Sequence, residues 1–399
     1  MSGRILHVIP SLAARYGGPS VAAIGMCRAL ERAGTKTLIA TTDADGPGRL
    51  PVETGAVVAF EGIDTIFFPR QLTESFKWSA PLAAWLADNV AAFDLVHVHA
   101  VFSHSSLAAA NACRASGIPY VVRPLGTLDP WSLSRHALRK QVLMLCGART
   151  MLRGAAAIHY TARLEQQRTE LGLPWLPRGI VVPLGIDDEW LDGEPVTRSD
   201  ERPTLVAMSR LDGKKGVDLL IEAFREVATD AALDDWRLVI AGDGPERYVD
   251  SLRRLAQAGA ARDRIEFRGW VSGAERRALL QDARLFALPS LQENFGIALV
   301  EAMASGVPAV VCPGVNLAAD LELAGAGWVS ERTRTALAET LHTAMSSSAA
   351  LDRRSVCART FARRFHWAEV ADRLKSMYDS VLHHPAPPVP GSLRPARQV

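Results

Sequence analysis

Two carboxylates, Glu293 and Glu301, stand eight residues apart in the stretch PSLQENFGIALVEAMASGVPAVV and could act together on one ligand. The apolar run before them predicts a buried strand, and the residues after them have helical spacing that ends at Gly306. Glu293 would precede the helix, and Glu301 would lie about two turns inside it on nearly the same side. Such a pair suits a ligand with many hydroxyl groups, although two surface glutamates would give the same pattern.

Cationic side chains follow another predicted strand of the same half, in SRLDGKKGVDLL. Arg210 stands at the end of that strand, and Lys214 and Lys215 come just before a predicted helix. Cations at a strand end beside a helix N-terminus are typical of a diphosphate site. A solvated basic turn is the alternative interpretation.

Glycines follow a third strand, in AGDGPER. Gly242 and Gly244 would let the backbone approach a ligand closely, because glycine has no side chain. The third position of a dinucleotide fingerprint holds Arg247, so this stretch is a weak signal for an oxidoreductase.

Short apolar strands alternate with helical segments along the 399 residues, which predicts an α/β fold with parallel sheets. We expect two doubly wound, Rossmann-like domains facing across a cleft, with ligands at the carboxyl ends of their strands. The predicted domains cover residues 1–186 and 204–365, with a polar linker at 187–203. The Pro-rich end, 384–399, is expected to be disordered.

The composition is that of a soluble globular protein, with 48% hydrophobic residues and a net charge of +2. Nothing in this charge indicates a nucleic-acid partner. The five cysteines are scattered and odd in number, which fits a reducing compartment and no structural zinc. The start is too polar for a signal peptide, and no apolar run reaches the roughly 18 residues of a membrane span.

The first half offers its own candidates. Gly17 and Gly18 follow the first strand, where a glycine pair permits close approach of backbone or a positive φ. His97 and His99 share a face of a predicted strand. With His104 they invite a zinc interpretation, but no acidic or Cys ligand completes a site locally. We expect His99 to be a polar cleft residue and His97 to be packed or bonded in the sheet.

These motifs together resemble glycosyltransferase family 4, which has the GT-B architecture. The matching stretches are SRLDGKKG, GDGPER, FRGWVSGAE and the E-x7-E stretch, and a helix at about 366–383 resembles the closing helix that returns to the first domain. The resemblance implies a retaining, metal-independent transferase that uses a nucleotide-diphosphate sugar as co-substrate and no other cofactor. It assigns catalysis to Arg210, Lys215 and Glu293, the first two neutralising the diphosphate and the third contacting the donor sugar. It assigns donor binding to Gly18, Gly242, Gly244, Val271, Asn294, Phe295, Gly296 and Glu301, the last of which would accept hydrogen bonds from the ribose.

One motif departs from the wider family. In PYVVRPLGTLDPW, Arg123 stands where many members have a histidine. This variant resembles a branch that builds bacterial surface polysaccharides such as exopolysaccharide or O-antigen. Arg123 and His99 would then lie on the acceptor side, where an arginine suits a glycan or lipid-linked acceptor with an anionic group.

No Asp or Glu occurs between Pro130 and Leu164, where basic residues alternate with large apolar ones. Such a segment either lies on an anionic membrane or packs on the core with a solvated basic face. We therefore expect a cytoplasmic enzyme, in peripheral contact with the inner face of the cell membrane if the first alternative holds.

Two other functions fit the same fold. One is a nucleotide-sugar 2-epimerase, and the other is a non-catalytic scaffold subunit that binds the donor. The intact set Arg210, Lys215, Glu293 and Glu301 argues against the scaffold. A phosphorylase would need a pyridoxal lysine, for which the sequence offers no context. The sugar, the base and the acceptor are not specified by these patterns.

Overall fold

The computed structural model describes residues 3–191 and 202–383, which form two compact units. Of the described residues, the first unit takes 3–185 and 367–383, and the second takes 186–191 and 202–366. Of the predicted linker, residues 192–201 lie outside the described residues, and Asp188–Leu191 form the short helix α8 of the second unit. The predicted tail, 384–399, also lies outside them.

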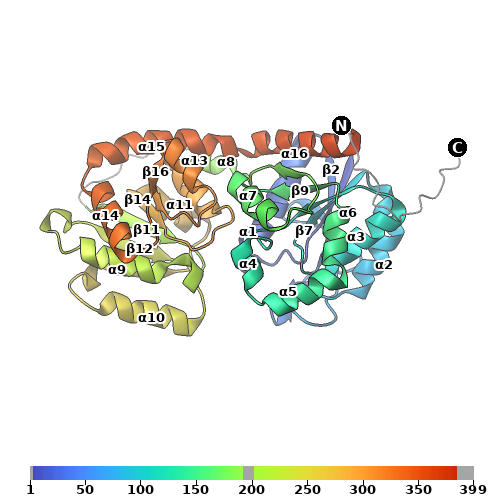
Figure 1. Ribbon diagram of the computed structural model, residues 1–399, viewed down its shortest axis with the longest axis horizontal. Coiled ribbons are helices and arrows are strands. Elements are labelled where there is room, and N and C mark those ends of the chain that lie inside the picture. Colours follow the sequence, from blue (N-terminus) through green and yellow to red (C-terminus); the bar gives the residue numbers. More distant parts are fainter. Residues whose placement is uncertain (1–2, 192–201, 384–399) are drawn as a thin grey trace. The chain divides into compact units, whose positions relative to one another are not determined.

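An eight-stranded sheet runs through the first unit in the order β10-β9-β8-β7-β1-β2-β6-β5 (Figure 1). Its strands are parallel except β5, which pairs antiparallel with β6 at the edge. Nearly every residue of β1, β7 and β8 is buried, as expected for a parallel sheet covered on both faces. The strands are β1 (Arg4–Val8), β2 (Lys36–Thr42), β5 (Val57–Phe60), β6 (Ile63–Phe68), β7 (Leu95–His99), β8 (Tyr120–Arg123), β9 (Ala157–Tyr160) and β10 (Gly179–Val181).

The two faces of this sheet differ in chemistry. One face carries Leu6, Val96 and Val122 and packs on α2 (Ala80–Asn89), α3 (His104–Ser116) and α6 (Arg149–Gly154). The other face is covered by α1 (Gly18–Arg32) and α16 (Trp367–His383) and carries several polar side chains. The remaining elements include α4 (Pro130–Ser134), α5 (Ala137–Leu143), α7 (Arg163–Gly172) and the hairpin β3 (Ala44–Asp45)–β4 (Gly48–Arg49).

The second unit has a six-stranded, fully parallel sheet in the order β13-β12-β11-β14-β15-β16. Helices α9, α10 and α14 cover one face, and α11, α12 and α15 cover the other (Figure 1). The strands are β11 (Thr204–Met208), β12 (Arg237–Ala241), β13 (Ile265–Gly269), β14 (Leu285–Leu288), β15 (Ala309–Val311) and β16 (Gly327–Val329). The helices are α9 (Val217–Val227), α10 (Glu246–Gln257), α11 (Gly273–Asp282), α12 (Ile297–Ala304), α13 (Ala318–Leu323), α14 (Arg334–Met345) and α15 (Ser348–Ala362).

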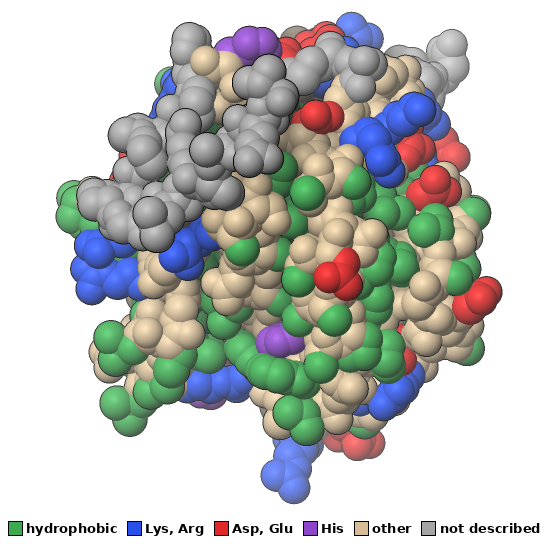
Figure 2. Space-filling view, turned by 90° about the vertical axis from the view of Figure 1, so that its right-hand side faces the viewer, with side chains coloured by type: hydrophobic (Ala, Val, Ile, Leu, Met, Phe, Trp, Pro, Cys, Tyr) green, Lys and Arg blue, Asp and Glu red, His purple; other side chains and the backbone are tan. Residues whose placement is uncertain are grey.

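The predicted fold class, two doubly wound α/β units, is confirmed. In each sheet the strand order reverses once near the middle, between β7 and β1 in the first unit and between β11 and β14 in the second. The carboxyl ends of strands at such a reversal are the usual binding sites of open α/β sheets. Figure 2 shows one face of the first unit, on which hydrophobic side chains are scattered and most charged ones lie towards the edges.

No helix among residues 3–191 and 202–383 combines the length and the apolar character needed to cross a bilayer.

Candidate functional site

Lys215 and Glu293 meet at the strand reversal of the second unit. Lys215 ends a short 3-10 turn after β11, and Glu293 follows β14, the neighbouring strand. The Lys215 Nζ donates a hydrogen bond to Glu293 Oε2, and the two side chains are only 9% and 17% exposed. The structure therefore joins two residues that lie 78 positions apart in the sequence.

Backbone contacts hold this pair in place. The Glu293 N–H donates to the Gly314 carbonyl oxygen at 2.9 Å, and the Asn316 N–H donates to the Glu293 carbonyl oxygen at 3.1 Å. Gly216, just after Lys215, has a φ of +69°, and a Cβ there would lie 2.4 Å from the Pro289 carbonyl oxygen. The turn carrying Lys215 can thus pack directly on the end of β14, because position 216 is glycine.

Positive charge is in excess around this pair. Arg210 is exposed at the end of β11 and forms no ion pair with any described residue. Lys214 is half-buried, and burial and the neighbouring Lys215 lower the pKa of its ammonium group, with Arg210 acting in the same direction. Three cations thus gather at one strand end, and Glu293 accepts a hydrogen bond from only one of them. Such a group favours an anionic ligand.

The glycines after β12 allow a close approach of two backbone segments within the protein. A Cβ on Gly242 would lie 1.8 Å from the Ser209 carbonyl oxygen, and one on Gly244 would lie 1.9 Å from that of Leu211. The Ser209 N–H also donates to the Ala241 carbonyl oxygen at 3.1 Å. The close approach is therefore between this turn and the segment that carries Arg210, and any contact of these glycines with a donor remains a prediction.

Glu301 has a partner that the sequence did not indicate. It lies on α12, is almost fully buried, and accepts a hydrogen bond from Nη2 of Arg276 on α11. Burial raises the pKa of the Glu301 carboxyl to about 7, and Arg276 opposes that rise. Glu293 and Glu301 therefore have separate cationic partners, Lys215 and Arg276. The only sequence signal for Arg276 is its place in the helix after FRGWVSGAE.

The other predicted donor residues surround α12 and the end of β13. Gly296 caps α12 with a φ of +81°, and Asn316 Nδ2 donates to the Asn294 carbonyl oxygen at 3.1 Å. Phe295 is buried, with its ring edge-on to Phe365 at 5.4 Å between centroids. Val271 is also buried, just beyond β13. These residues fix the shape of the site, and their contact with a ligand stays a prediction.

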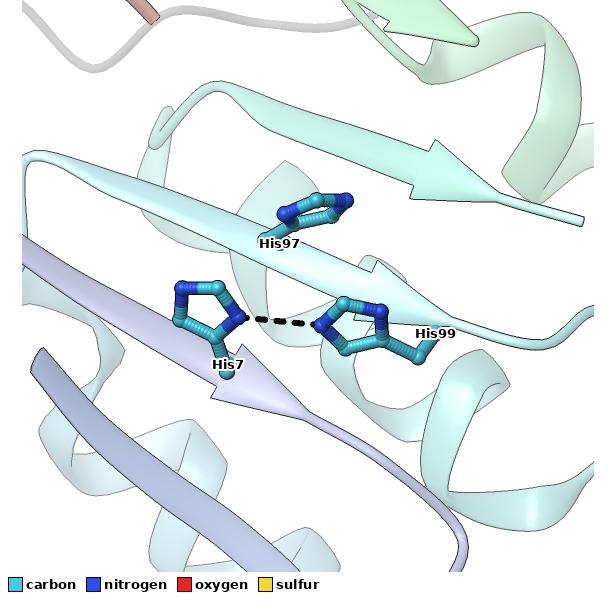
Figure 3. A group of neighbouring side chains, drawn as sticks. All are labelled: His7, His97 and His99. Carbon is cyan, nitrogen blue, oxygen red and sulfur yellow. Dashed lines mark hydrogen bonds between the residues drawn. The ribbon is translucent and has the colours of Figure 1, made fainter. Parts of the chain in front are cut away.

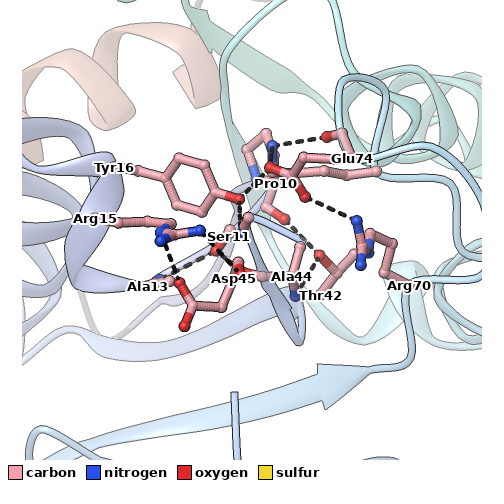
Figure 4. A network of polar contacts seen from close by, with 12 residues as sticks. Pro10, Ser11, Ala13, Arg15, Tyr16, Thr42, Ala44, Asp45, Arg70 and Glu74 are labelled. Carbon is pink, nitrogen blue, oxygen red and sulfur yellow. Dashed lines mark hydrogen bonds and ion pairs between the residues drawn. The ribbon is translucent and has the colours of Figure 1, made fainter. Parts of the chain in front are cut away.

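In the first unit, the loop before α1 is tied down by a polar network (Figure 4). Tyr16 donates to Glu74 and accepts from the Gly46 N–H at 2.9 Å. Burial, followed by the hydrogen bond to Glu74, raises the pKa of Tyr16 to about 12. Arg15 pairs with Asp45 at 3.2 Å. The adjacent Asp43 pairs with Arg49 at 3.5 Å and accepts from the backbone N–H of Arg70, so both aspartates hold this hairpin.

That network positions the glycine pair at the N-terminus of α1. Gly17 has a φ of +66° and a ψ of −133°, with open space where a Cβ would lie. Gly18 is the first residue of α1 and is half-buried. The predicted donor residue is Gly18, but the backbone that requires glycine is at Gly17. The role of Gly18 towards a ligand stays a prediction.

His99 belongs to a buried histidine cluster on the α1 and α16 face of the first sheet (Figure 3). His7 Nδ1 and His99 Nε2 are 3.0 Å apart, and their rings are stacked. Burial lowers the pKa of both imidazoles, that of His7 to about 3, with Arg123 as the next cause. The cluster is therefore neutral at physiological pH.

The hydrogen-bond directions in the rest of the cluster follow from one carbonyl. His159 Nε2 lies 2.8 Å from the Val182 carbonyl oxygen, which can only accept, so the proton sits on Nε2. His97 Nε2 must then donate to His159 Nδ1 at 3.1 Å. His97 Nδ1 must accept from the Tyr378 hydroxyl at 2.9 Å. This chain ties α16 to β7 and β9.

The expectation for His99 and Arg123 needs correction. We expected accessible polar residues on the acceptor side, but both side chains are fully buried. Arg123 lies under α1, with Nη1 3.4 Å from Met26 Sδ and Nη2 3.4 Å from the Pro19 carbonyl oxygen. A register that pairs His99 with Arg123 and His7 with His97 brings these residues together. The order of the strands in the sheet decides that these side chains are buried, and the sequence alone does not specify that order.

The cluster also bears on the zinc interpretation. Nitrogens of His7, His97 and His99 lie within 4.8 Å of one another and could in principle hold a metal ion. His97, however, uses both its nitrogens in hydrogen bonds, and Arg123 adds a positive charge beside the group. His104 lies apart and accepts from the Ser79 N–H at 3.2 Å. The arrangement favours a hydrogen-bonded cluster over a metal centre.

Comparison with known families accounts for nearly the whole chain. A family model described as "Glycosyl transferases group 1" matches residues 188–360, and one described as "Glycosyl transferase 4-like domain" matches residues 17–185. The Anabaena protein HepE, solved with UDP and glucose, superposes with a TM-score of 0.71 and 20% identity. That likeness covers 95% of this chain and 100% of HepE, and it supports the GT-B fold.

The curated relatives differ in how much of their length aligns with this chain. A phosphatidylinositol monomannoside mannosyltransferase of Mycobacterium tuberculosis is 34% identical over 32% of this chain, which spans 36% of its length. A 2-deoxystreptamine glucosyltransferase of Streptomyces kanamyceticus is 30% identical over 72% of this chain and 76% of its own. A cellobiosyl-diphosphopolyprenol α-mannosyltransferase of Xanthomonas oryzae is 24% identical over 96% and 98%. The chain thus spans only about a third of the mycobacterial relative but most of the other two.

Proposed function

Because this chain belongs to glycosyltransferase family 4, we propose that it transfers a sugar from a nucleotide-diphosphate donor to a glycan or lipid-linked acceptor, with retention of the anomeric configuration. The observation that carries the proposal is the Lys215–Glu293 pair at the strand reversal of the second unit. Arg210 and Lys214 stand beside it and make the site cationic. A diphosphate needs cations beside it, and the sugar attached to it needs a carboxylate, so the two kinds of side chain are needed together.

The chemistry assigns a task to each side chain. Breaking the bond between sugar and diphosphate builds negative charge on the leaving group and positive charge on the sugar. Lys215 and Arg210 would stabilise the diphosphate, and the Glu293 carboxylate would lie at the sugar. Because fixed cations of the chain already gather there, we propose that Mg²⁺ is not needed. Glu301, further along α12, would accept hydrogen bonds from the ribose.

The acceptor and its place in metabolism are proposed from the relatives. Two of them are named for a lipid, phosphatidylinositol or a diphosphopolyprenol. We propose a lipid-linked acceptor in the synthesis of a surface polysaccharide. Since Arg123 and His99 are buried, they would shape the acceptor side from within the sheet rather than bind the acceptor directly.

The same proposal sets the place of work at the inner face of the cell membrane, where nucleotide sugars and lipid-linked acceptors meet. Helix α5 supports it, because none of its residues is buried and Leu138 and Val142 are exposed beside Arg139. The membrane alternative for residues 130–164 is therefore favoured over core packing for α5 itself. Neighbouring Ala148 and Met151 are buried and anchor the rest of the segment.

The test is a donor panel with a membrane extract as the source of acceptors, run with EDTA present. Transfer of sugar from UDP-, GDP- or ADP-sugars to a lipid-extractable product, with retained configuration, is expected. Epimerised sugar formed with water alone would instead identify a 2-epimerase. Nucleotide binding without turnover on any acceptor would identify a donor-binding scaffold, and activity restored only by Mg²⁺ would refute metal independence.

A further inference from the structure

The pair formed by Arg276 and Glu301 joins α11 to α12 in the second unit. The Glu301 side chain is only 7% exposed, and Arg276 donates from Nη2 to Glu301 Oε2. The Nε atom of Arg276 is buried and has no hydrogen-bond partner among the described residues. Arg276 is therefore committed to Glu301 on one side and keeps a free N–H group on the other.

Helix α8 completes the surroundings of this pair by packing against α12. The Trp190 ring lies beneath two consecutive arginines, with its centroid 5.9 Å from the guanidinium carbon of Arg276 and 5.5 Å from that of Arg277. Arg277 forms its ion pair with Glu189, not with Glu301. Neighbouring arginines on one helix thus share an aromatic platform but have different carboxylate partners.

Other charged groups near Glu301 do not replace Arg276. Asp187 acts in the opposite direction, since it raises the pKa of Glu301, and Asp188 of α8 pairs with His366 at 3.2 Å. From α15, which packs on α12, Arg359 lies beside Gly306, beyond the carboxyl end of α12. Arg276 is the cation in contact with a carboxylate that burial would otherwise neutralise.

We propose that Arg276 is a positioning residue of the nucleoside site, which keeps Glu301 ionised and oriented so that it can accept hydrogen bonds from the ribose. The proposal rests on the proposed function, in which Glu301 reads the ribose. It adds that nucleotide affinity depends on pH through this pair. A protonated carboxyl group has a donor hydrogen and less acceptor capacity, so the ionised form accepts more strongly from the ribose hydroxyls.

The sign of the pH effect follows. Burial raises the pKa of Glu301 to about 7 in the wild type, so nucleotide affinity should fall as the pH drops below that value. Without Arg276 the carboxyl would hold its proton to higher pH, because an opposite charge in contact favours the ionised form. The pH at which affinity declines should therefore rise in Arg276→Gln, and strong binding should return in alkaline solution.

The experiment titrates the full chain with UDP, GDP and ADP by calorimetry at pH 6, 7.5 and 9. In Arg276→Gln, affinity should be about threefold weaker than wild type at pH 7.5 and about tenfold weaker at pH 6, as a shift of about one pH unit requires, and close to wild type at pH 9. Arg277→Gln, with the same loss of charge above the same Trp190, should follow the wild-type profile. Arg276→Lys should restore most of the affinity at pH 7.5.

The pH profile of Arg276→Gln separates a positioning role of Arg276 from a purely structural one. A loss of affinity in Arg276→Gln that is equal at all three pH values would show a structural role and overturn the proposal, and so would a profile like that of the wild type. In both cases nucleotide binding by the wild type would leave the proposed function standing. If none of UDP, GDP and ADP binds the wild-type chain at any pH, the proposed function and this inference both fail.

Discussion

At the scale of the residue, the site of the second unit depends on how charges are shared. Lys215 bonds to Glu293, while Arg210 and Lys214 add positive charge without bonding to that carboxylate. An entering diphosphate would meet cations that are already fixed, with little reorganisation at the moment of reaction. Preorganised charge of this kind is usually the largest single contribution to stabilising a transition state.

Lys215→Ala tests that contribution directly. We expect kcat/KM to fall about 100-fold or more, since removing one preorganised contact costs about 3 kcal/mol of transition-state stabilisation. Arg253→Ala, at an exposed position of α10, provides a control for the loss of one positive charge. Unchanged turnover of Lys215→Ala, in a variant that melts like the wild type, would mean that the diphosphate binds elsewhere.

At the scale of the element, the two turns after β11 and β12 act as one unit. Gly242 and Gly244 leave no room for a side chain against the backbone of the segment that carries Arg210. The position of that arginine is therefore set by a neighbouring turn as well as by its own strand. Loss of either glycine should disturb stability and donor binding together.

Gly242→Ala should lower the free energy of unfolding by at least about 2 kcal/mol, because its φ of +135° and the Ser209 carbonyl oxygen 1.8 Å from the new Cβ both oppose it. Gly213→Ala is the matched control, since nothing lies within 4 Å of a Cβ there and its φ is not positive. That control should stay within about 0.5 kcal/mol of the wild type. Urea unfolding measures both, and equal stabilities would contradict the packing argument.

The buried histidine cluster, which includes a hydrogen bond to α16, predicts how the stability of the first unit depends on pH. Burial lowers the pKa of His7 and His159 to about 3 and that of His97 and His99 in the same direction, so these residues stay neutral when folded. Unfolded histidine binds a proton below about pH 6.5. The stability that neutral burial allows is therefore complete above that pH and is lost as the pH falls towards 3.

Urea unfolding at pH 7.5 and pH 5 should show this loss, at about 1.4 kcal/mol per pH unit for each histidine that stays neutral when folded. Arg123 and Tyr378 also face the cluster, but neither gains or loses a proton between these two pH values in its reference state. Burial raises the pKa of the Glu165 carboxyl, so proton uptake by the folded chain there offsets part of the loss. His342→Gln removes a histidine at the surface, paired with Asp230 and outside the cluster, and should leave most of the loss in place. Equal stability at both pH values would refute the neutral cluster.

The sequence predicted the parts of this structure that depend on local pattern. Continuous apolar strands such as β14, and a helix that begins after Gly296 and ends before Gly306, follow from residues within a few positions. The Arg276–Glu301 pair does not, because two different helices must pack before the side chains meet. The burial of Arg123 likewise depends on α1 covering β8, a contact between residues about a hundred positions apart.

At the scale of the whole molecule, the net charge is small, but acidic and basic residues are distributed unevenly along the chain. Residues 130–164 contain no acidic side chain. Within them Leu138, Val142 and Leu145 are 81%, 57% and 82% exposed, and their spacing of four and three residues places them on one side of α5 and the turn that follows. Large apolar side chains beside exposed basic ones are typical of a helix that lies in an anionic membrane surface.

Arg135 and Arg139 test this surface, because both are exposed and can be changed without disturbing the core. Each basic residue near an anionic surface contributes about 1 kcal/mol, so changing both to Gln should weaken binding to phosphatidylglycerol-containing liposomes about 30-fold in co-sedimentation. Changing Arg253 and Arg254 of α10 to Gln removes the same charge away from the apolar stripe and should have little effect. Leu138→Ser should weaken binding even at high salt, where charge is screened within about 3 Å. If the wild type ignores such liposomes at low salt, α5 is no membrane surface, and the acceptor reaches the enzyme by another route.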